Sequence, residues 1–267
     1  MPQETAMDTG AEVFSDPSLR EMIDAGVFFG RTRTRTNPKM RGYILTTRNN
    51  IEIIDLEKTK ELLDKASEFI KNKVKEGASL MFVGTQPAAS EGVLKLAQEF
   101  KFPSVVTRWL GGTLTNFRVI SKRLEYFKKL KIDWENPSFQ EKYTKKERLG
   151  IERELRNLNQ EMASLEAMTE RPKILIVIDP NAHMAAVKEG IKLNIPIVAF
   201  INTDVNPDLI TYPVPGNNKA RASVSWFLDK LREAISAGIA EAKVLKEAEP
   251  EKKEEAVKNN DGGNTKA

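Results

Sequence analysis

Three arginines alternate with threonines from Arg31 to Thr36, in a stretch that contains no acidic residue. All charged residues from Phe28 to Asn50 are basic: Arg31, Arg33, Arg35, Lys39, Arg41 and Arg48. Alternate side chains of an extended chain lie on one face about 6.6 Å apart, so we expect an extended arm with three guanidinium groups in a row. One guanidinium group can donate two parallel hydrogen bonds to the oxygens of a phosphate. A row of such groups therefore predicts binding to a polyphosphate backbone. The alternative is a solvated, threonine-rich edge strand.

A second basic segment lies between Lys101 and Lys131, where eight cations stand against one acid, Glu125. Trp109 adds a planar ring that could stack on a base, although a core tryptophan is an equal alternative. Gly111 and Gly112 indicate a tight turn rather than a mobile catalytic loop. We expect a nucleic-acid surface here, and its candidate residues are Arg108, Trp109, Asn116, Arg118, Lys122 and Arg123.

Two other groups of residues raise the alternative of a nucleotide-binding enzyme. The segment Gly84 to Pro87 opens a helix after a strand, but it lacks the glycine fingerprint, and Pro87 has no amide for a phosphate. Polar residues just beyond strand ends could form a metal or acid–base site: Asp179, His183, Asp204 and Asp208. Their sequence context fits turns and helix caps better. We therefore predict no catalytic residue, no metal ligand and no cofactor.

The composition narrows the class of protein further. Of the 267 residues, 40% are hydrophobic and 30% are charged, as in globular proteins of one or two domains. The absence of cysteine excludes disulfides and thiolate chemistry, and a single histidine leaves little for zinc. No stretch approaches the roughly 20 apolar residues of a membrane span, and residues 1–10 show no signal or transit pattern. We expect a cytoplasmic protein.

Continuous apolar runs predict the elements that position these residues. The runs are Leu80–Val83, Ile174–Ile178 and Ile197–Ile201, and each indicates a buried parallel strand. A short strand is expected at 104–106, and helices are expected at 87–100, 181–193 and 217–237. The predicted fold class is α/β, with a doubly wound parallel sheet.

The ends of the chain differ from this central part. Before the sheet, 43–46 and 51–55 flank Asn49-Asn50 as a predicted hairpin, and a helix is expected at 56–74. Residues 1–14 and the Glu/Lys-rich residues 241–267 are predicted to be disordered. The predicted core domain spans residues 15–240.

One helical segment of about 50 residues interrupts the alternation of strands and helices. Its apolar residues recur at steps of 3 and 4, which is typical of a coiled coil: Phe117, Ile120, Leu124 and Phe127, then Ile151, Leu155, Leu158, Met162 and Leu165. We predict an antiparallel coiled-coil hairpin over residues 116–168, with arms of roughly 30 Å. Such a protrusion is expected to contact a partner, and the alternative is a tolerated insertion.

Several motifs occur in an order that resembles a known family. They are Ala25-Gly26-Val27-Phe28-Phe29-Gly30, Asn37-Pro38-Lys39-Met40, Ile53-Ile54-Asp55-Leu56-Glu57-Lys58-Thr59, Phe82-Val83-Gly84-Thr85, Arg108-Trp109-Leu110-Gly111-Gly112-Thr113-Leu114-Thr115-Asn116 and the segment from Ile210 to Asn217. This order resembles the bacterial-type small-subunit ribosomal protein S-two family over about Asp16 to Gly238. The run around Trp109 is the most specific of these motifs.

The resemblance implies a structural constituent of the small ribosomal subunit that supports translation. It implies a flavodoxin-like parallel sheet, a coiled-coil protrusion and binding to small-subunit ribosomal RNA (rRNA). It also implies neighbouring ribosomal proteins as partners, including the messenger-binding protein S-one where an organism has one. RNA would be recognised by its shape and backbone rather than by its sequence.

The chain departs from the family where cations and histidines are concerned. Phe28 and Arg31 stand where the family commonly has two histidines, so a metal site at these positions is in doubt. Thr36 replaces a frequent aromatic residue, and Gln86-Pro87 replace a frequent basic pair. Phosphate contact is therefore expected to shift towards the arginine-rich arm. A free RNA chaperone is a further alternative to a permanent ribosomal constituent.

Overall fold

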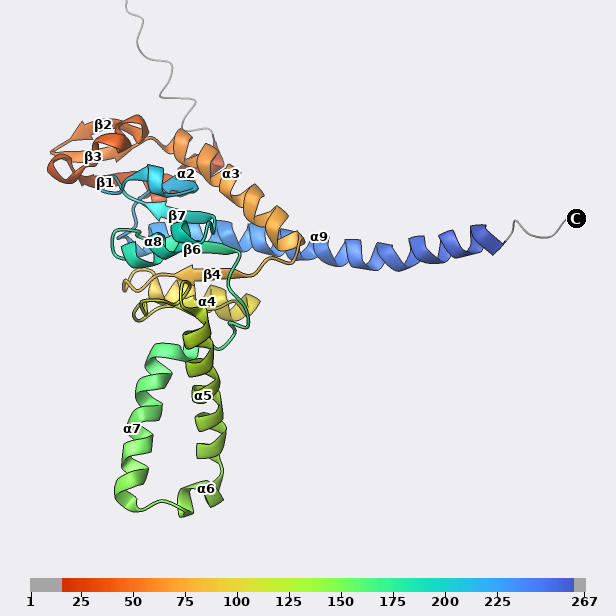
Figure 1. The fold of residues 1–267 in the computed structure, drawn as a ribbon. Coiled ribbons are helices and arrows are strands. Elements are labelled where there is room, and N and C mark those ends of the chain that lie inside the picture. The colour runs from red at the N-terminus through yellow and green to blue at the C-terminus, as the bar shows by residue number, and fades with distance from the viewer. Residues whose placement is uncertain (1–15, 262–267) are drawn as a thin grey trace, which may run out of the picture.

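The computed structural model describes the chain from Asp16 to Asp261, with its side chains from Asp16 to Val244 except those of Pro137 and Gln140. Figure 1 shows a small three-stranded sheet, a five-stranded sheet covered by helices and a helical arm that leaves the body. The strands are β1 (Phe29–Thr32), β2 (Ile44–Arg48), β3 (Ile51–Ile54), β4 (Leu80–Val83), β5 (Ser104–Val105), β6 (Ile174–Ile178), β7 (Ile197–Ile201) and β8 (Tyr212–Pro215).

Helices connect and cover these strands. The α-helices are α2 (Pro17–Asp24), α3 (Leu56–Lys75), α4 (Ser90–Phe100), α5 (Phe117–Glu135), α6 (Pro137–Glu141), α7 (Lys145–Met162), α8 (Met184–Lys192) and α9 (Arg221–Asp261). Short 3₁₀ turns are η1 (Arg33–Arg35), η2 (Pro38–Tyr43), η3 (Ala163–Leu165) and η4 (Pro207–Leu209).

The five-stranded sheet is parallel throughout and has the order β5-β4-β6-β7-β8. Numbered along the chain, this order is 2-1-3-4-5, which is the order of flavodoxin-type doubly wound sheets. The prediction of an α/β fold with a parallel sheet is confirmed. The edge strand β8 contains Pro213 and Pro215, which an edge strand tolerates because part of its ladder is unpaired.

Successive residues of the central strands enter two different cores. Phe82, Ile176 and Phe200 lie in the core beneath α2, α3, α4 and α9. Val83 and Val177 lie in the other core, which α5, α7 and α8 close. Side chains of a strand point alternately to the two faces of its sheet, so strands covered on both faces must be apolar at every position. The continuous apolar runs in the sequence have this cause.

The small sheet has the order β1-β3-β2 and contains the predicted hairpin. Asn49 and Asn50, with φ of 48° and 63°, form the turn between β2 and β3. A two-residue turn with both φ values positive matches the twist of its strands, and asparagine tolerates this conformation. The hairpin prediction is confirmed.

The predicted extended arm from Arg31 to Thr36 is wrong beyond Thr32. The backbone of Arg33–Arg35 turns into the 3₁₀ helix η1, where the Thr36 amide donates to the Arg33 carbonyl at 3.3 Å. Arg33 is anchored to the hairpin, because its amide donates to the Asn50 carbonyl at 3.0 Å. The alternation of arginine and threonine therefore does not place three side chains on one face.

Helices α5 and α7 lie between β5 and β6 in the chain and extend away from the body in Figure 1. Arg123 of α5 pairs with Glu161 of α7 at 3.3 Å, and the Tyr126 hydroxyl contacts Glu154 at 3.1 Å. Residues later in α5 thus contact residues earlier in α7. Thr144 and Glu147 form a reciprocal capping box at the start of α7.

Helix α9 packs along α3 and continues to Asp261. The sequence predicted that this helix ends at Ala237. The difference arises because the Glu/Lys/Ala-rich composition beyond Ala237, which is typical of disordered tails, also has high helix propensity. The predicted disorder of residues 1–14 lies outside the described residues.

Gly238 allows the close approach of α9 to α3. A Cβ atom there would lie 2.7 Å from the Lys71 carbonyl oxygen and 3.1 Å from Val74 Cβ. We expect Gly238→Ala to lower the free energy of unfolding by about 1 to 3 kcal/mol, because backbone atoms of α3 cannot move away freely. Urea unfolding followed by circular dichroism measures this change.

Gly150, in α7, is the matched control because a Cβ atom there would meet nothing within 4 Å. Gly150→Ala is expected to stabilise the chain by up to about 1 kcal/mol through helix propensity. Equal effects of the two substitutions would contradict close packing at Gly238.

Candidate nucleic-acid interface

Four arginines of the small-sheet region are exposed and form no ion pair with any described residue. They are Arg33, Arg35, Arg41 and Arg48, which we call the small-sheet cations. Their segment contains no acid, and Glu52 of β3 is buried, with its carboxylate accepting a hydrogen bond from Thr47 at 2.6 Å. Unpaired guanidinium groups in a segment without acids create a positive potential that attracts polyanions.

Arg31 has a different role, because it joins the two sheets. Its Nε atom lies 3.4 Å from Asp204, its Nη2 atom donates to Asn218 at 3.3 Å, and its amide donates to the Thr203 hydroxyl at 2.9 Å. The Arg31 side chain is 22% exposed. Lys39 is also paired, with Asp208. The positive charges of these two predicted phosphate contacts are therefore partly neutralised by acidic residues of the same chain.

The residues at the two positions that carry histidine in the resembling family do not fit a metal. Phe28 offers no ligand atom, and its ring centroid lies 4.1 Å from that of Phe29. Arg31 places a guanidinium cation beside Asp204, where it repels a metal ion. In the part of the chain that the structure describes, no group of three His, Cys, Asp or Glu residues could hold a metal.

The second predicted surface lies at the root of the helical arm, which consists of α5 to α7, where this arm leaves the body. Arg108, Arg118 and Lys122 are exposed and form no ion pair with a described residue, and we call them the arm-root cations. Arg123 is paired with Glu161. Asn116 is the exposed N-cap residue of α5, and its side chain makes no capping bond.

Trp109 is a core residue rather than a free stacking platform. Its ring is half-buried and packs against the core beneath α5 and α8. Its indole Nε1 atom donates to the carboxylate of Glu189 at 3.0 Å. Of the two alternatives that the sequence left open, the structure favours the core tryptophan. Glu189 itself was missed, because one glutamate in an amphipathic helix carries no signal.

The two groups of cations lie at opposite ends of the body. The small-sheet region contacts the residues that directly follow β7, where the Asn37 amide donates to the Thr203 carbonyl at 2.8 Å. The arm root follows β5, which is an edge strand separated from β7 by β4 and β6. In Figure 1, β7, β6 and β4 lie between the small sheet and α5. A single polyanion that contacts both groups must run along the body.

The carboxyl ends of β4 and β6 form the switch point, where a doubly wound sheet holds its ligands. The Asp179 carboxylate accepts hydrogen bonds from Gln86 and from Lys219, the latter at 2.9 Å. The His183 ring lies 3.0 Å from the Thr85 hydroxyl and 2.9 Å from the Asp179 carbonyl. Asp179 Oδ2 and the His183 ring are thus bonded within the site, and the buried Asp179 Oδ1 atom is the one carboxylate oxygen there without a hydrogen-bond partner among the described residues. With the Asp179 carboxylate already paired with Lys219, the arrangement does not favour the nucleotide-binding alternative.

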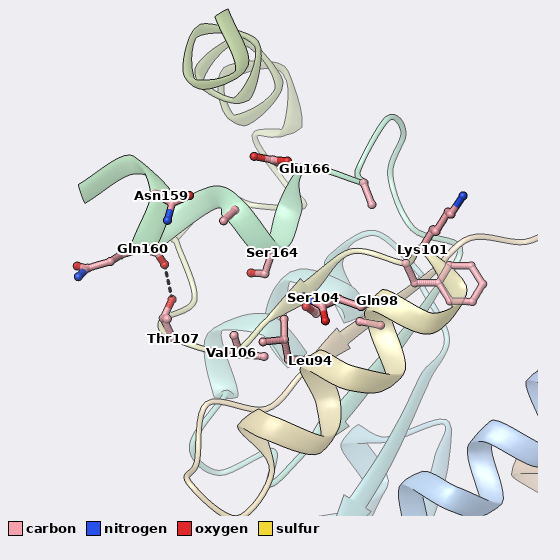
Figure 2. Close-up of a pocket in the computed structure, with 14 residues that line it drawn as sticks. Leu94, Gln98, Lys101, Ser104, Val106, Thr107, Asn159, Gln160, Ser164 and Glu166 are labelled. Carbon is pink, nitrogen blue, oxygen red and sulfur yellow. Dashed lines mark hydrogen bonds between the residues drawn. The ribbon is translucent and has the colours of Figure 1, made fainter. Parts of the chain in front are cut away.

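Two hollows were not anticipated from the sequence. A groove of about 770 Å³ lies between α4, the edge strand β5 and η3, and Figure 2 shows Thr107 donating to the Gln160 carbonyl at 3.0 Å beside it. A second hollow, of about 410 Å³, crosses the apolar outer face of the small sheet. Phe29, Leu45 and Ile51 on that face are 44%, 69% and 37% exposed, which is unusual for such large apolar side chains.

Comparisons with known proteins agree in one family. The sequence model of a family described as "Ribosomal protein S2" matches residues 22–238. A Corynebacterium diphtheriae protein named "Small ribosomal subunit protein uS2" is 42% identical over 230 residues, covering 86% of this chain and 85% of that protein. Proteins of the same name from Corynebacterium jeikeium and Mycolicibacterium vanbaalenii are 39% and 40% identical, over 94% and 83% of this chain and 88% and 81% of their own lengths.

Arg31 is expected to matter for folding more than the neighbouring arginines do. Arg31→Met leaves Asp204 without its cation, and Asp204 already has one buried oxygen, Oδ1, without a hydrogen-bond partner. We expect the free energy of unfolding to fall by about 1 to 3 kcal/mol. Arg33→Met removes the same charge from an exposed position and is expected to change it by less than about 0.5 kcal/mol. Equal losses of unfolding free energy for Arg31→Met and Arg33→Met in urea unfolding would contradict a special structural role of Arg31.

Proposed function

The chain belongs to the ribosomal protein S2 family, and from this membership we propose that it is a structural constituent of the small ribosomal subunit. In this role it binds small-subunit rRNA and neighbouring ribosomal proteins in support of translation, in the cytoplasm and without enzymatic activity. The single observation that carries the proposal is the family match over residues 22–238. No described helix is long and apolar enough to cross a membrane.

The RNA contacts that we propose are the small-sheet cations and the arm-root cations. Exposed arginines without an acidic partner can approach phosphates without breaking an ion pair, and their forked donors match phosphate oxygens. We propose weaker contributions from the ion-paired residues Arg31, Lys39 and Arg123. Trp109 and Asn116 are proposed to support the loop rather than to bind bases.

Helices α5 and α7 are proposed to form an antiparallel coiled-coil arm that contacts another component of the subunit. The contacts of Arg123 with Glu161 and of Tyr126 with Glu154 support an antiparallel pair. The arm has exposed apolar side chains, including Val119 and Ile132, which are 54% and 68% exposed. Exposed apolar groups at such positions favour a protein partner over a purely solvated arm.

The outer face of the small sheet is proposed to contact a neighbouring protein. Its exposed apolar side chains, Phe29, Leu45 and Ile51, cannot bond phosphates, so this part of the face suits a protein better than an RNA backbone. Arg48 also lines the hollow and is the one small-sheet cation that does so. From the resemblance we further propose the messenger-binding protein S-one as a partner where the organism has one.

Removing three small-sheet cations should weaken rRNA binding and change its salt dependence. We expect Arg33→Gln, Arg35→Gln and Arg41→Gln together to reduce the slope of log K against log salt by about 2 to 3 units. The matched control removes three lysines that are paired with acids, Lys65, Lys73 and Lys95, and should leave the slope nearly unchanged. Filter binding to small-subunit rRNA measures both, and identical slopes would exclude the small-sheet cations as phosphate contacts.

The structural role predicts stable residence in the small subunit. Tagged protein is expected to sediment with the small-subunit peak of a sucrose gradient and to stay there in moderate salt. Recovery only in the free fraction would contradict the proposal, and transient recovery on immature particles would favour an RNA chaperone. Saturable micromolar binding of a nucleotide in calorimetry would favour the enzyme alternative.

A further inference from the structure

Glu189 of α8 is the acceptor of five hydrogen bonds from one loop. Its Oε1 atom accepts from Trp109 Nε1 at 3.0 Å and from the Gly112 amide at 2.9 Å. Its Oε2 atom accepts from the amides of Leu114 and Thr115, both at 3.0 Å, and from the Thr115 hydroxyl at 3.1 Å. One carboxylate thus binds donors from four residues, and we call this arrangement the Glu189 clasp.

The clasped loop lies between the end of β5 and the start of α5. It turns sharply at Gly112, where φ is +88° and a Cβ atom would lie 3.2 Å from Asn116 Cβ. The Asn116 amide donates to the Gly112 carbonyl at 2.8 Å, directly before α5 begins at Phe117. The conformation of the loop therefore sets the backbone directly before α5, while the buried residues of α5 hold the helix against the core.

The carboxylate of Glu189 is held in its charged form. Partial burial alone raises the pKa of Glu189, but the bond from Trp109 and the amides of Thr115, Gly112 and Leu114 lower it below its ordinary value. Hydrogen bonds to an ionised acceptor are shorter and stronger than bonds between neutral groups. The clasp is therefore present at neutral pH.

The clasp also occupies the amides that the loop could otherwise offer to an anion. The amides of Gly112, Leu114 and Thr115 all point at Glu189, so they are not available to an RNA phosphate. The contribution of this region to RNA binding must come from side chains, and Arg108 precedes the clasped residues directly. Glu189 can influence RNA binding only through the loop.

We propose that Glu189 is a positioning residue that fixes the loop from Arg108 to Asn116, and through it the direction of the arm from α5 to α7. Its consequence for RNA binding rests on the proposed function, whereas its consequence for the arm does not. The loss of the clasp frees the loop, so that Arg108 and the arm sample several orientations in place of one.

The test measures the direction of the arm in the full-length chain without RNA. The chain contains no cysteine, so Asn72→Cys on α3 and Lys146→Cys on α7 allow two spin labels to be attached at exposed positions. We expect Glu189→Gln to broaden the distance distribution between the labels, because a neutral side chain with an amide nitrogen cannot accept all five bonds. An unchanged distribution would overturn the proposal.

Two further variants make the test independent of a folding defect. Glu152→Gln removes a glutamate on the surface of α7 that, among the described residues, is bonded only to Arg156, and it should leave the distribution unchanged. Thr115→Val removes a single donor to Glu189 and should give an intermediate distribution. If Glu189→Gln fails to fold, the Thr115→Val result decides, and its identity with the unsubstituted chain would overturn the proposal.

RNA binding supplies the second readout. We expect Glu189→Gln to weaken rRNA binding by about three- to tenfold with an unchanged salt slope, because order is lost rather than a phosphate contact. A reduced slope would show that Glu189 does not act through positioning alone and would overturn that part of the proposal. A chain that binds no RNA in any variant would refute the proposed function, while the distance measurement would still decide the role of Glu189.

Discussion

The rest of the structure depends on burying β4, β6 and β7 on both faces. Every residue of these strands is buried, and alternate side chains enter two separate cores. Helices must therefore cover both faces of the sheet, and α5 is one of them, with Ile120 and Leu124 buried in the second core. The arm is consequently not an appendage on a finished domain, because its root is part of the core. The Glu189 clasp lies at this root, on the loop directly before α5.

The distribution of charge follows from where acids are absent. The chain has 42 lysines and arginines against 38 acids, so its net charge of +4 says little about where a polyanion would bind. Many cations on α3, α4 and α9 face an acid within the same helix or a neighbouring one, as Lys95 does with Glu91. Exposed pairs of this kind contribute little to stability, but they cancel the local potential. The small sheet and the arm root are positive because their exposed arginines form no ion pair with a described acid, and Glu52, which lines a hollow together with Arg33 and Arg41, is buried.

Much of the fold could be predicted because the sequence patterns that indicate it involve residues close together in the chain. The Asn49-Asn50 turn and the three apolar runs identify the hairpin and the central strands from a few neighbouring residues. Arg31 could not be placed in this way, since the Thr203 hydroxyl that accepts its amide lies 172 positions further along the chain. Glu189 is similar, because its donors lie 74 to 80 positions earlier. The length of α9 was missed because one composition indicates both a disordered tail and a helix.

The segment from Arg33 to Arg35 forms a 3₁₀ turn rather than the extended strand expected from the sequence. This difference alters the expected geometry of phosphate binding. In an extended strand Arg33 and Arg35 would point the same way, whereas in a helix with three residues per turn they point in directions about 120° apart. A flat row of guanidinium groups would suit one straight backbone. Arginines that diverge from a turn suit phosphates that converge from different strands, as they do where an RNA folds on itself. Since Arg31 is bound to Asp204, its side chain anchors this turn to the five-stranded sheet, and the exposed arginines are presented from a fixed base.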